Sequence, residues 1–218
     1  MVEQLDGKLL KEDRLYVLSG EEMKKNFACE RAVPFNEAMC LGNAAADIFG
    51  KEFVSCRVQS LHTTDGEYVK KVLSPLAPLF ALPESVCFVF GEDMFCKINL
   101  LTLAAYLDKI GYTGRAEAVL LKDESDFFGE KRFLQNVFKD AYAAYETLVL
   151  QRRMPKKFPV FLSEEDAFRY LDYKNGGKIA EFIRAHAGEK DLLFSLLREF
   201  SSYGLGDTQY LEMIKRYK

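Results

Sequence analysis

The sequence predicts an α/β fold, in which a mostly parallel sheet lies between layers of helices and a helical region follows. In the first half of the chain, short apolar runs that end at turn residues alternate with stretches of helical periodicity. The clearest unit is a strand, a helix and a second strand within residues 85–121. A helix between two neighbouring strands makes a crossover connection, which implies that the strands are parallel.

This unit begins with "SVCFVF" (85–90), an uninterrupted apolar run that is typical of a strand buried on both faces. Asp93 then stands where a helix cap is expected, and apolar residues recur at helical spacing to about Ile110. The turn "GYTG" ends this helix, and "AEAVLL" (116–121) supplies the next strand.

Two further strands are expected nearer the N-terminus. The first is "RLYVLSG" (14–20), and the second lies around residues 32–36. Pro34 counts against the second strand, since proline cannot donate to a central ladder. Helical patterns follow both, at "EEMKKNFA" and at 44–61, and Asp65 is the expected cap of a helix that Pro75 and Pro78 bend or end.

After Leu121 the pattern changes, and from Arg132 onward the chain is predicted to be helical. A long amphipathic stretch is followed by a polar, proline-bearing linker at 151–159 and by a capping box from Ser163 to Asp166. We therefore expect a three-layer, Rossmann-like α/β domain over residues 1–125 and a helical C-terminal region over residues 126–218.

Composition excludes several classes of protein. The 218 residues are 49% hydrophobic and 29% charged, and the net charge of −3 provides no positive field to attract nucleic acid. Apolar stretches are interrupted before the ~18 residues that a membrane span needs. Five cysteines without a C-x-x-C pair and two distant histidines give no zinc spacing. Free thiols and a polar, acidic N-terminus without a signal-peptide pattern predict a cytoplasmic protein.

Polar and acidic residues follow each predicted strand, at the edge of the sheet where open α/β proteins bind ligands. They are Ser19, Glu21, Glu22, Asn36, Glu37, Glu92, Asp93, Asp123 and Glu124. The glycine motifs that bind dinucleotides or triphosphates are absent from the sequence, and carboxylates at this edge would repel a lone phosphate. A magnesium ion, a polyol or ribose, or an amine would suit such a rim.

Each of these residues also has a purely structural interpretation. Asp93 could serve only as a helix cap, and Glu37 and Glu92 could be solvated loop residues. Arg57, in an otherwise mostly apolar helix, could bind an anionic ligand or form a partly buried ion pair. Cys96, near the start of a helix, has no histidine beside it in the sequence and is interpreted as a packing residue.

The helical C-terminal region raises a second class of function. Its short helices and glycine turn could form a helix-turn-helix or winged module that binds DNA or a protein, although "YGLGD" is also typical of a helix stop, with Asp207 as the cap of the next helix. Residues 176–218 contain seven Lys/Arg against six Asp/Glu, which is not the basic face of a typical DNA-binding module. The run "RRMPKK" (152–157) is interpreted as solvated surface, and the aromatic residues Phe127 and Phe128 could mark an interface in a homo-oligomer.

Three segments resemble an uncharacterised bacterial family that is defined by a domain of unknown function. They are "FNEAMCLG" (35–42), "EFVSCRVQSL" (52–61) and "VFGEDMFCKINLLTLAAYL" (89–107). The resemblance covers about residues 14–122, and the helical region is similar to a segment often appended to that domain. It implies a common site at the matching residues, which are Glu37, Arg57, Glu92, Asp93 and Asn99. It implies no particular activity.

Together these observations predict a protein that binds a small polar molecule, nucleotide-like or sugar-like, at the carboxyl ends of its strands. Glu37, Arg57, Glu92 and Asp93 are the predicted ligand-binding residues, with Ser19 and Asn36 as secondary members. Magnesium is the candidate cofactor, and no catalytic residue or reaction is assigned. The alternative is a regulatory or interaction protein that acts through its C-terminal helices.

Overall fold

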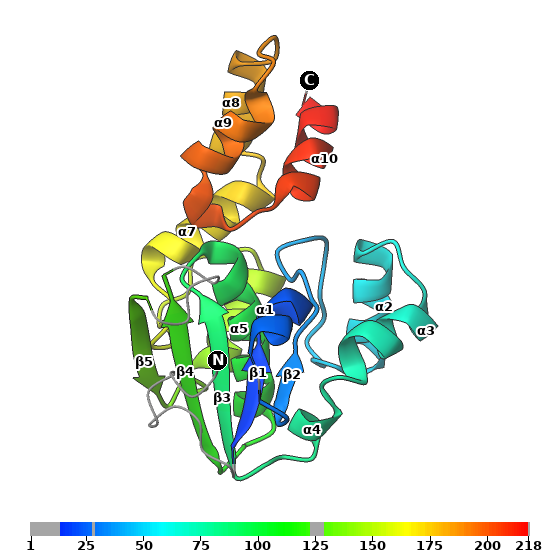
Figure 1. Cartoon of the computed structure of the whole chain (residues 1–218), viewed down its shortest axis with the longest axis vertical. Coiled ribbons are helices and arrows are strands. Elements are labelled where there is room, and N and C mark those ends of the chain that lie inside the picture. Colours follow the sequence, from blue (N-terminus) through cyan, green and yellow to red (C-terminus); the bar gives the residue numbers. More distant parts are fainter. Residues whose placement is uncertain (1–13, 28, 123–128, 218) are drawn as a thin grey trace.

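The computed structural model describes residues 14–27, 29–122 and 129–217. Five strands form one sheet in the order β2–β1–β3–β4–β5, with helices against its faces (Figure 1). Helices from the C-terminal part of the chain extend beyond one end of the sheet. The predicted class, a mostly parallel α/β sheet between helices with further helices after it, is therefore confirmed.

The four predicted strands are all present and are parallel to one another. β1 (Leu15–Leu18) pairs with β2 (Ala32–Pro34) on one side and with β3 (Ser85–Gly91) on the other, and β3 pairs with β4 (Arg115–Leu121). β3 is buried along its whole length, as its apolar run predicts. Pro34 lies in β2, at the edge of the sheet, where its missing N–H costs no central ladder bond.

A fifth strand, β5 (Lys131–Gln135), pairs antiparallel with β4. The prediction of a continuous helix from Arg132 is wrong here. Most side chains of this edge strand are exposed, and Phe133 has 60% of its surface accessible, so the segment lacks the apolar alternation that reveals a strand in sequence. Pairing with β4 decides its conformation. The next helical segments, α6 (Ala141–Tyr145) and the π-helical η2 (Glu146–Leu150), belong to the layer packed on the sheet.

Two hydrophobic cores lie on opposite faces of the sheet, because successive side chains of a strand point in opposite directions. Leu18 belongs to the core beneath α1 (Gly20–Asn26), and the neighbouring Val17 belongs to the core beneath α5 (Met94–Lys109). The connection from β2 to β3 carries α2 (Lys51–Ser60), α3 (Asp65–Tyr68), the π-helical η1 (Val69–Leu73) and α4 (Ala77–Phe80).

Several predicted helix boundaries are confirmed and two shift. Asp93 caps α5 through a hydrogen bond from the backbone N–H of Cys96. The helix expected over 44–61 begins only at Lys51, after a series of turns. The cap expected at Asp65 is Thr64 instead, whose hydroxyl accepts from the N–H of Glu67. As expected, η1 ends shortly before Pro75.

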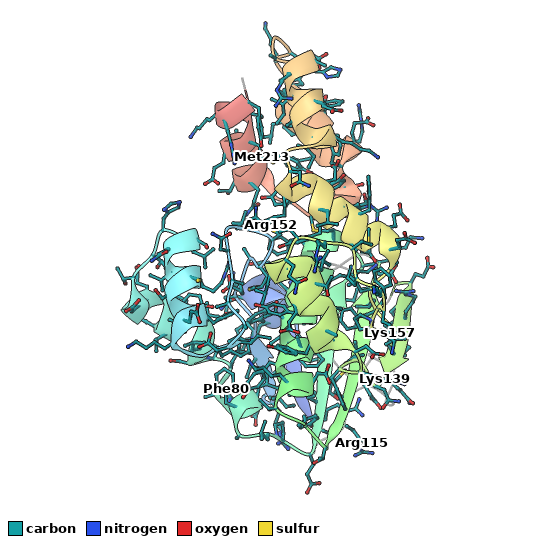
Figure 2. The ribbon with its side chains drawn as sticks, turned by 180° about the vertical axis from the view of Figure 1, so that it is seen from behind. Phe80, Arg115, Lys139, Arg152, Lys157 and Met213 are labelled. Atoms are coloured by element: carbon teal, nitrogen blue, oxygen red, sulfur yellow. The ribbon has the colours of Figure 1, made fainter. Side chains whose placement is uncertain are left out.

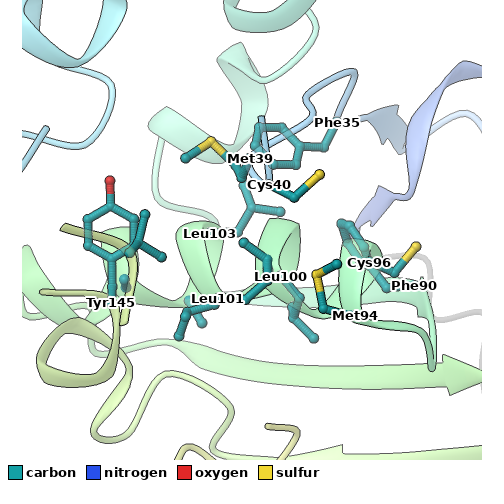
Figure 3. Close-up of a cluster of buried hydrophobic side chains, with 14 of the residues drawn as sticks. Phe35, Met39, Cys40, Phe90, Met94, Cys96, Leu100, Leu101, Leu103 and Tyr145 are labelled. Carbon is teal, nitrogen blue, oxygen red and sulfur yellow. The ribbon is translucent and has the colours of Figure 1, made fainter. Parts of the chain in front are cut away.

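The loop that follows β2 is packed down onto α5. Figure 3 shows Met39 and Cys40 of this loop beside Leu100 and Leu103 of the helix. All four side chains are buried. The loop is therefore fixed by core packing rather than free in solvent, and it holds the neighbouring Glu37 in place.

The C-terminal helices form a tail at the end of the sheet where the parallel strands finish (Figure 1). A buried ion pair joins the tail to the body, with Lys97 Nζ of α5 at 2.9 Å from Asp166 Oδ2. Ser163 and Asp166 make the predicted capping box. The tail elements are α7 (Glu164–Lys174), α8 (Lys178–Ala185), α9 (Leu192–Glu199), the 3-10 turn η3 (Ser201–Tyr203) and α10 (Asp207–Tyr217). No helix within the described ranges has the length and apolar content to cross a membrane.

Candidate functional site

A cavity of about 220 Å³ lies at the carboxyl ends of β1 and β2. In a sheet of order 2-1-3-4-5, the connections leave in opposite directions from β1 and β3, and ligands of such folds bind in the crevice at this switch point. Residues that follow β1 and β2 line the cavity, together with the first turns of α5. Its lining consists of Ser19, Gly20, Phe35, Asn36, Glu37, Ala38, Leu61, Phe95 and Asn99.

Ser19 and Asn36 supply the cavity's accessible polar groups. The Ser19 hydroxyl lies 3.2 Å from the sulfur of Cys96. Asn36 donates its amide N–H to the carbonyl oxygen of Lys71 at 3.0 Å. Its own carboxamide oxygen faces Gly20, where φ is +85° and no Cβ is present to fill the space. A ligand hydroxyl could therefore reach both a hydroxyl and an amide oxygen here.

Glu37 also borders the cavity, but its carboxylate is buried against Arg57. The two side chains have no solvent-accessible surface, and Arg57 Nη2 lies 2.9 Å from Glu37 Oε1. Glu37 Oε2 accepts from the Arg57 Nε–H at 3.3 Å and from the hydroxyl of Tyr68 at 2.5 Å. Burial, and then the charge of Glu37, raises the pKa of Tyr68 far above its usual value, so this hydroxyl keeps its proton.

Arg57 uses all five of its N–H donors within the protein. Besides the bonds to Glu37, it donates to the backbone carbonyl oxygens of Ala38, Leu41 and Asn43 at 2.7–3.0 Å. Burial alone would lower the pKa of the guanidinium, but the charge and hydrogen bonds of Glu37 raise it. Of the two interpretations of Arg57, the geometry supports the ion pair, which organises the loop 37–43.

Asn99 completes this arrangement from α5. Its side-chain amide donates to the carbonyl oxygen of Glu37 at 2.7 Å, and its side-chain oxygen accepts from the N–H of Met39 at 2.9 Å. Asn99 is thus a positioning residue for the loop, with both halves of its carboxamide engaged.

Glu92 and Asp93 lie apart from the cavity. Glu92 forms an ion pair of 2.5 Å with Arg132 of β5. Asp93 accepts the cap bond from the N–H of Cys96 at 2.8 Å, and its carboxylate lies against Gly204 of the tail, so closely that a Cβ there would stand 1.9 Å from Oδ1. The carboxylates of these two adjacent residues therefore have different partners, Arg132 of β5 for Glu92 and the first turn of α5 for Asp93.

The expected convergence of all six predicted residues on one cleft is therefore corrected. Ser19, Asn36 and Glu37 border one cavity, whereas the other three are absent from its lining. The physical reason is that each remaining charge has a partner inside the protein, namely Glu37, Arg132 or the first turn of α5. Whether the six residues bind a ligand stays a prediction. Asp123, Glu124, Phe127 and Phe128 lie outside the described residues.

Metal and thiol chemistry receive little support from the side chains that the structure describes. Among them, no three His, Cys, Asp or Glu side chains are grouped so that they could hold a metal ion. None of the five cysteines is part of a disulfide, and Cys96 is buried against Ser19. His186 contacts the carbonyl oxygen of Phe182 at the end of α8, as expected for a residue at a helix C-terminus. The interpretation of Cys96 as a packing residue agrees with this environment.

Phe95 is an aromatic residue of the cavity lining that sequence reasoning did not single out. It is half-buried beside Ser19 and Asn36 and presents an aromatic surface to a ligand. Its signal was its position, two residues after the Asp93 cap, where a side chain at the start of α5 faces the ends of the neighbouring strands.

Comparisons of the chain with protein-family models, with curated proteins and with solved structures give no match. The resemblance to a bacterial family therefore stays a prediction. Fold and site together define a doubly wound α/β protein that has a small cavity, lined by both apolar and polar residues, at the switch point of its sheet.

Proposed function

We propose that the protein binds a small, uncharged, hydroxyl-bearing molecule, such as a single sugar ring or a nucleoside, in the cavity at the ends of β1 and β2. The position of the cavity supports this proposal most strongly, because ligands of doubly wound sheets bind at the carboxyl ends of strands beside the switch point. Ser19 and Asn36 would bind hydroxyl groups, and Phe95 would contact the flat or apolar face of the ligand.

The balance of charge favours a neutral ligand over a phosphate or an amine. Among the lining residues that the structure describes, Glu37 alone is charged, and Arg57 already neutralises it. An ionic group that entered the cavity would lose hydration without gaining a counter-charge. A magnesium ion is not needed for such a ligand, since the carboxylates of Glu92 and Asp93 act elsewhere.

The same lining supports binding rather than turnover. Ser19 faces a thiol, and no histidine belongs to the cavity lining that the structure describes. A hydroxyl nucleophile needs an adjacent general base, which this lining does not supply. The proposed function is therefore that of a binding protein.

Isothermal titration with a panel of monosaccharides and nucleosides tests the proposal. Asn36→Leu keeps similar volume but removes the carboxamide, so the dissociation constant should rise about two- to tenfold, the value of one hydrogen bond. Asn26→Leu, at the exposed end of α1, is the matched control and should leave binding unchanged. If none of the neutral molecules binds, or if Asn36→Leu binds as the wild type does, the cavity is not the site.

A second candidate, interaction with another protein through the tail, is favoured by one observation. Phe194 of α9 exposes 72% of its surface, more than any other large hydrophobic residue described. Phe194→Ser would then reduce self-association or partner capture in cross-linking without changing the unfolding temperature. An unchanged cross-linking pattern would remove this candidate.

A further inference from the structure

A second, larger groove of about 660 Å³ separates the body from the tail. The loop 40–43 and the end of α2 form one wall, and α7 and α10 form the other. Arg152, in the segment between η2 and α7, also lines the groove. Figure 2 places it between the body and Met213 of α10, which also lines the groove.

Positive side chains dominate the charged lining of this groove. Lys174, at the end of α7, donates to the backbone carbonyl oxygens of Cys40, at 3.2 Å, and of Gly42. Arg152 donates to the side-chain oxygen of Asn43 at 2.9 Å. Arg216 of α10 faces the same space, where Glu212 is the single carboxylate among the described lining residues.

The three cations are not neutralised within the described part of the chain. Arg152, Lys174 and Arg216 have no carboxylate there at ion-pair distance, whereas the nearby Arg57 is matched by Glu37. Burial, and then repulsion from Arg152, lowers the pKa of Lys174 to about 8. This shift is the consequence of a half-buried amine that lacks an acidic partner.

Two of the six described non-glycine residues with positive φ line this groove. Arg152 has φ +52° and His62, which lines the opposite wall, has φ +51°, in the left-handed region that non-glycine residues rarely adopt. Strained residues of this kind are concentrated at binding sites, because the surrounding structure must hold them in place.

We propose that this groove binds the phosphate group of a small phosphorylated molecule, held by Arg152 and Lys174. The guanidinium of Arg152 uses one N–H within the protein and can offer others as a fork to two phosphate oxygens. Lys174 contributes its third N–H and its charge. The carboxamides of Gln59 and Gln209 lie on opposite walls and would meet the rest of the molecule.

The geometry favours a small molecule over a nucleic acid. The groove has the volume of a typical small-molecule site. Nucleic-acid binding needs an extended basic track, yet Arg152 and Lys157, both from the basic run, lie far apart on the body in Figure 2. The net charge of −3 also gives no general attraction to a polyanion.

Titration calorimetry with inorganic phosphate, glucose 6-phosphate and glucose, at low salt, tests the proposal. We expect glucose 6-phosphate to bind more tightly than glucose, and the signal from inorganic phosphate alone to reveal how much the phosphate group contributes. Arg152→Gln and Lys174→Met should each weaken binding of the phosphorylated compound at least tenfold. Arg153→Gln is the matched control, because the adjacent Arg153 is exposed, contacts Gln151 and does not line the groove.

Proton uptake gives a second readout that a merely structural role of Lys174 would not produce. Phosphate binding should raise the pKa of Lys174, so at pH 8.5 the complex takes up protons, while the phosphate itself is already ionised. Calorimetry in two buffers of different ionisation enthalpy measures this uptake, which Lys174→Met should abolish. The other titratable or charged groups that the structure describes around Lys174 and the groove are Cys40, Cys56, Arg57, His62, Arg152, Tyr170, Tyr173, Glu212, Arg216 and Tyr217, and they remain in the variant.

Three outcomes would overturn the proposal. One is an affinity for glucose 6-phosphate that Arg152→Gln and Lys174→Met leave unchanged, and another is an equal loss in Arg153→Gln and Arg152→Gln. The third is salt-dependent binding of an oligonucleotide without binding of the phosphate monoester. If circular dichroism shows that Lys174→Met misfolds, the test uses Arg152→Gln and Arg216→Gln instead, because both arginines are exposed. Asn36→Leu should leave phosphate binding intact, so this proposal can fail or stand independently of the neutral-ligand cavity.

Discussion

Cations contact the loop 37–43 from two sides, and the two sides differ in whether a carboxylate neutralises the positive charge. On the inner side, Arg57 is fully buried and is matched by Glu37. On the outer side, Lys174 and Arg152 contact the same loop but have no carboxylate partner in the described chain. A charge that the protein neutralises itself serves the fold, whereas an unneutralised charge beside a groove is available to a ligand.

The inner pair is stable only because every donor and acceptor is used. Taking an ion pair out of water costs several kcal/mol per ion, and good geometry with further hydrogen bonds must offset that cost. Arg57 meets this requirement with Glu37 and three backbone carbonyl oxygens. The predicted ligand-binding role of Arg57 would require it to exchange these partners for a ligand.

The largest expected effect comes from breaking the inner pair. Arg57→Met leaves the Glu37 carboxylate buried without a counter-charge and releases the carbonyl oxygens of the loop. The free energy of unfolding should fall by about 4 kcal/mol, measured by urea denaturation. A loss of less than about 1 kcal/mol would mean that the pair is dispensable and that Arg57 has another purpose.

A double variant separates the charge from the packing. Glu37→Leu combined with Arg57→Met removes both buried ions, so it should be less destabilised than Arg57→Met alone. Equal losses in the two proteins would show that the loop hydrogen bonds, and not the unpaired carboxylate, account for the effect.

Asp93 is another charge that the protein itself uses: the sequence suggested both a ligand residue and a helix cap, and the structure shows the cap. Asp93→Ala should cost about 1 kcal/mol of stability in thermal or urea unfolding, since the cap bond to the N–H of Cys96 is lost. Asp93→Asn should cost much less, because asparagine caps a helix as well as aspartate does. Equal losses for both would show that the negative charge, rather than the cap, is what matters.

Much of the fold could be predicted from the sequence because its central elements have strong local signals. The buried run of β3, the cap at Asp93 and the capping box at Ser163 depend on residues close together in the chain. β5 has no such signal, since it is an exposed edge strand formed by pairing with β4. Because β5 was not predicted, the ion pair between Arg132 of β5 and Glu92 could not be predicted either. This pair occupies the Glu92 carboxylate that was expected to face a ligand.

The groove could not be predicted for a related reason. Its walls come from segments that are far apart in the sequence, and Lys174 contacts the carbonyl oxygen of Cys40 across 134 positions. Nothing near Lys174 marks it, because a lysine in the last turn of a helix is ordinary. Arg152 belongs to a basic run that local reasoning interprets as solvated, and only its contact with Asn43 places it at the groove.

The smallest expected effect is a pH dependence of stability that comes from Lys174. Its folded pKa is lowered to about 8, below the 10.5 of a free lysine, so between these values the unfolded chain holds a proton that the folded chain has lost. Stability therefore gains from this group as pH rises through that window. Burial raises the pKa of Cys40 and Cys87 to about 12, which acts in the opposite direction, since unfolded thiols ionise near pH ~8.5.

Lys174→Met isolates this contribution, because both thiols remain in the variant. The free energy of unfolding of the wild type minus that of Lys174→Met should increase from pH ~7.5 to ~9.5, measured by urea denaturation at several pH values. Added inorganic phosphate should flatten the increase if the groove binds it, since an anion beside the amine restores the proton. A difference that is constant or falls over this range would mean that Lys174 keeps an ordinary pKa. The contrast between Arg57, whose charge Glu37 neutralises, and Lys174, whose charge has no such partner in the described chain, would then disappear.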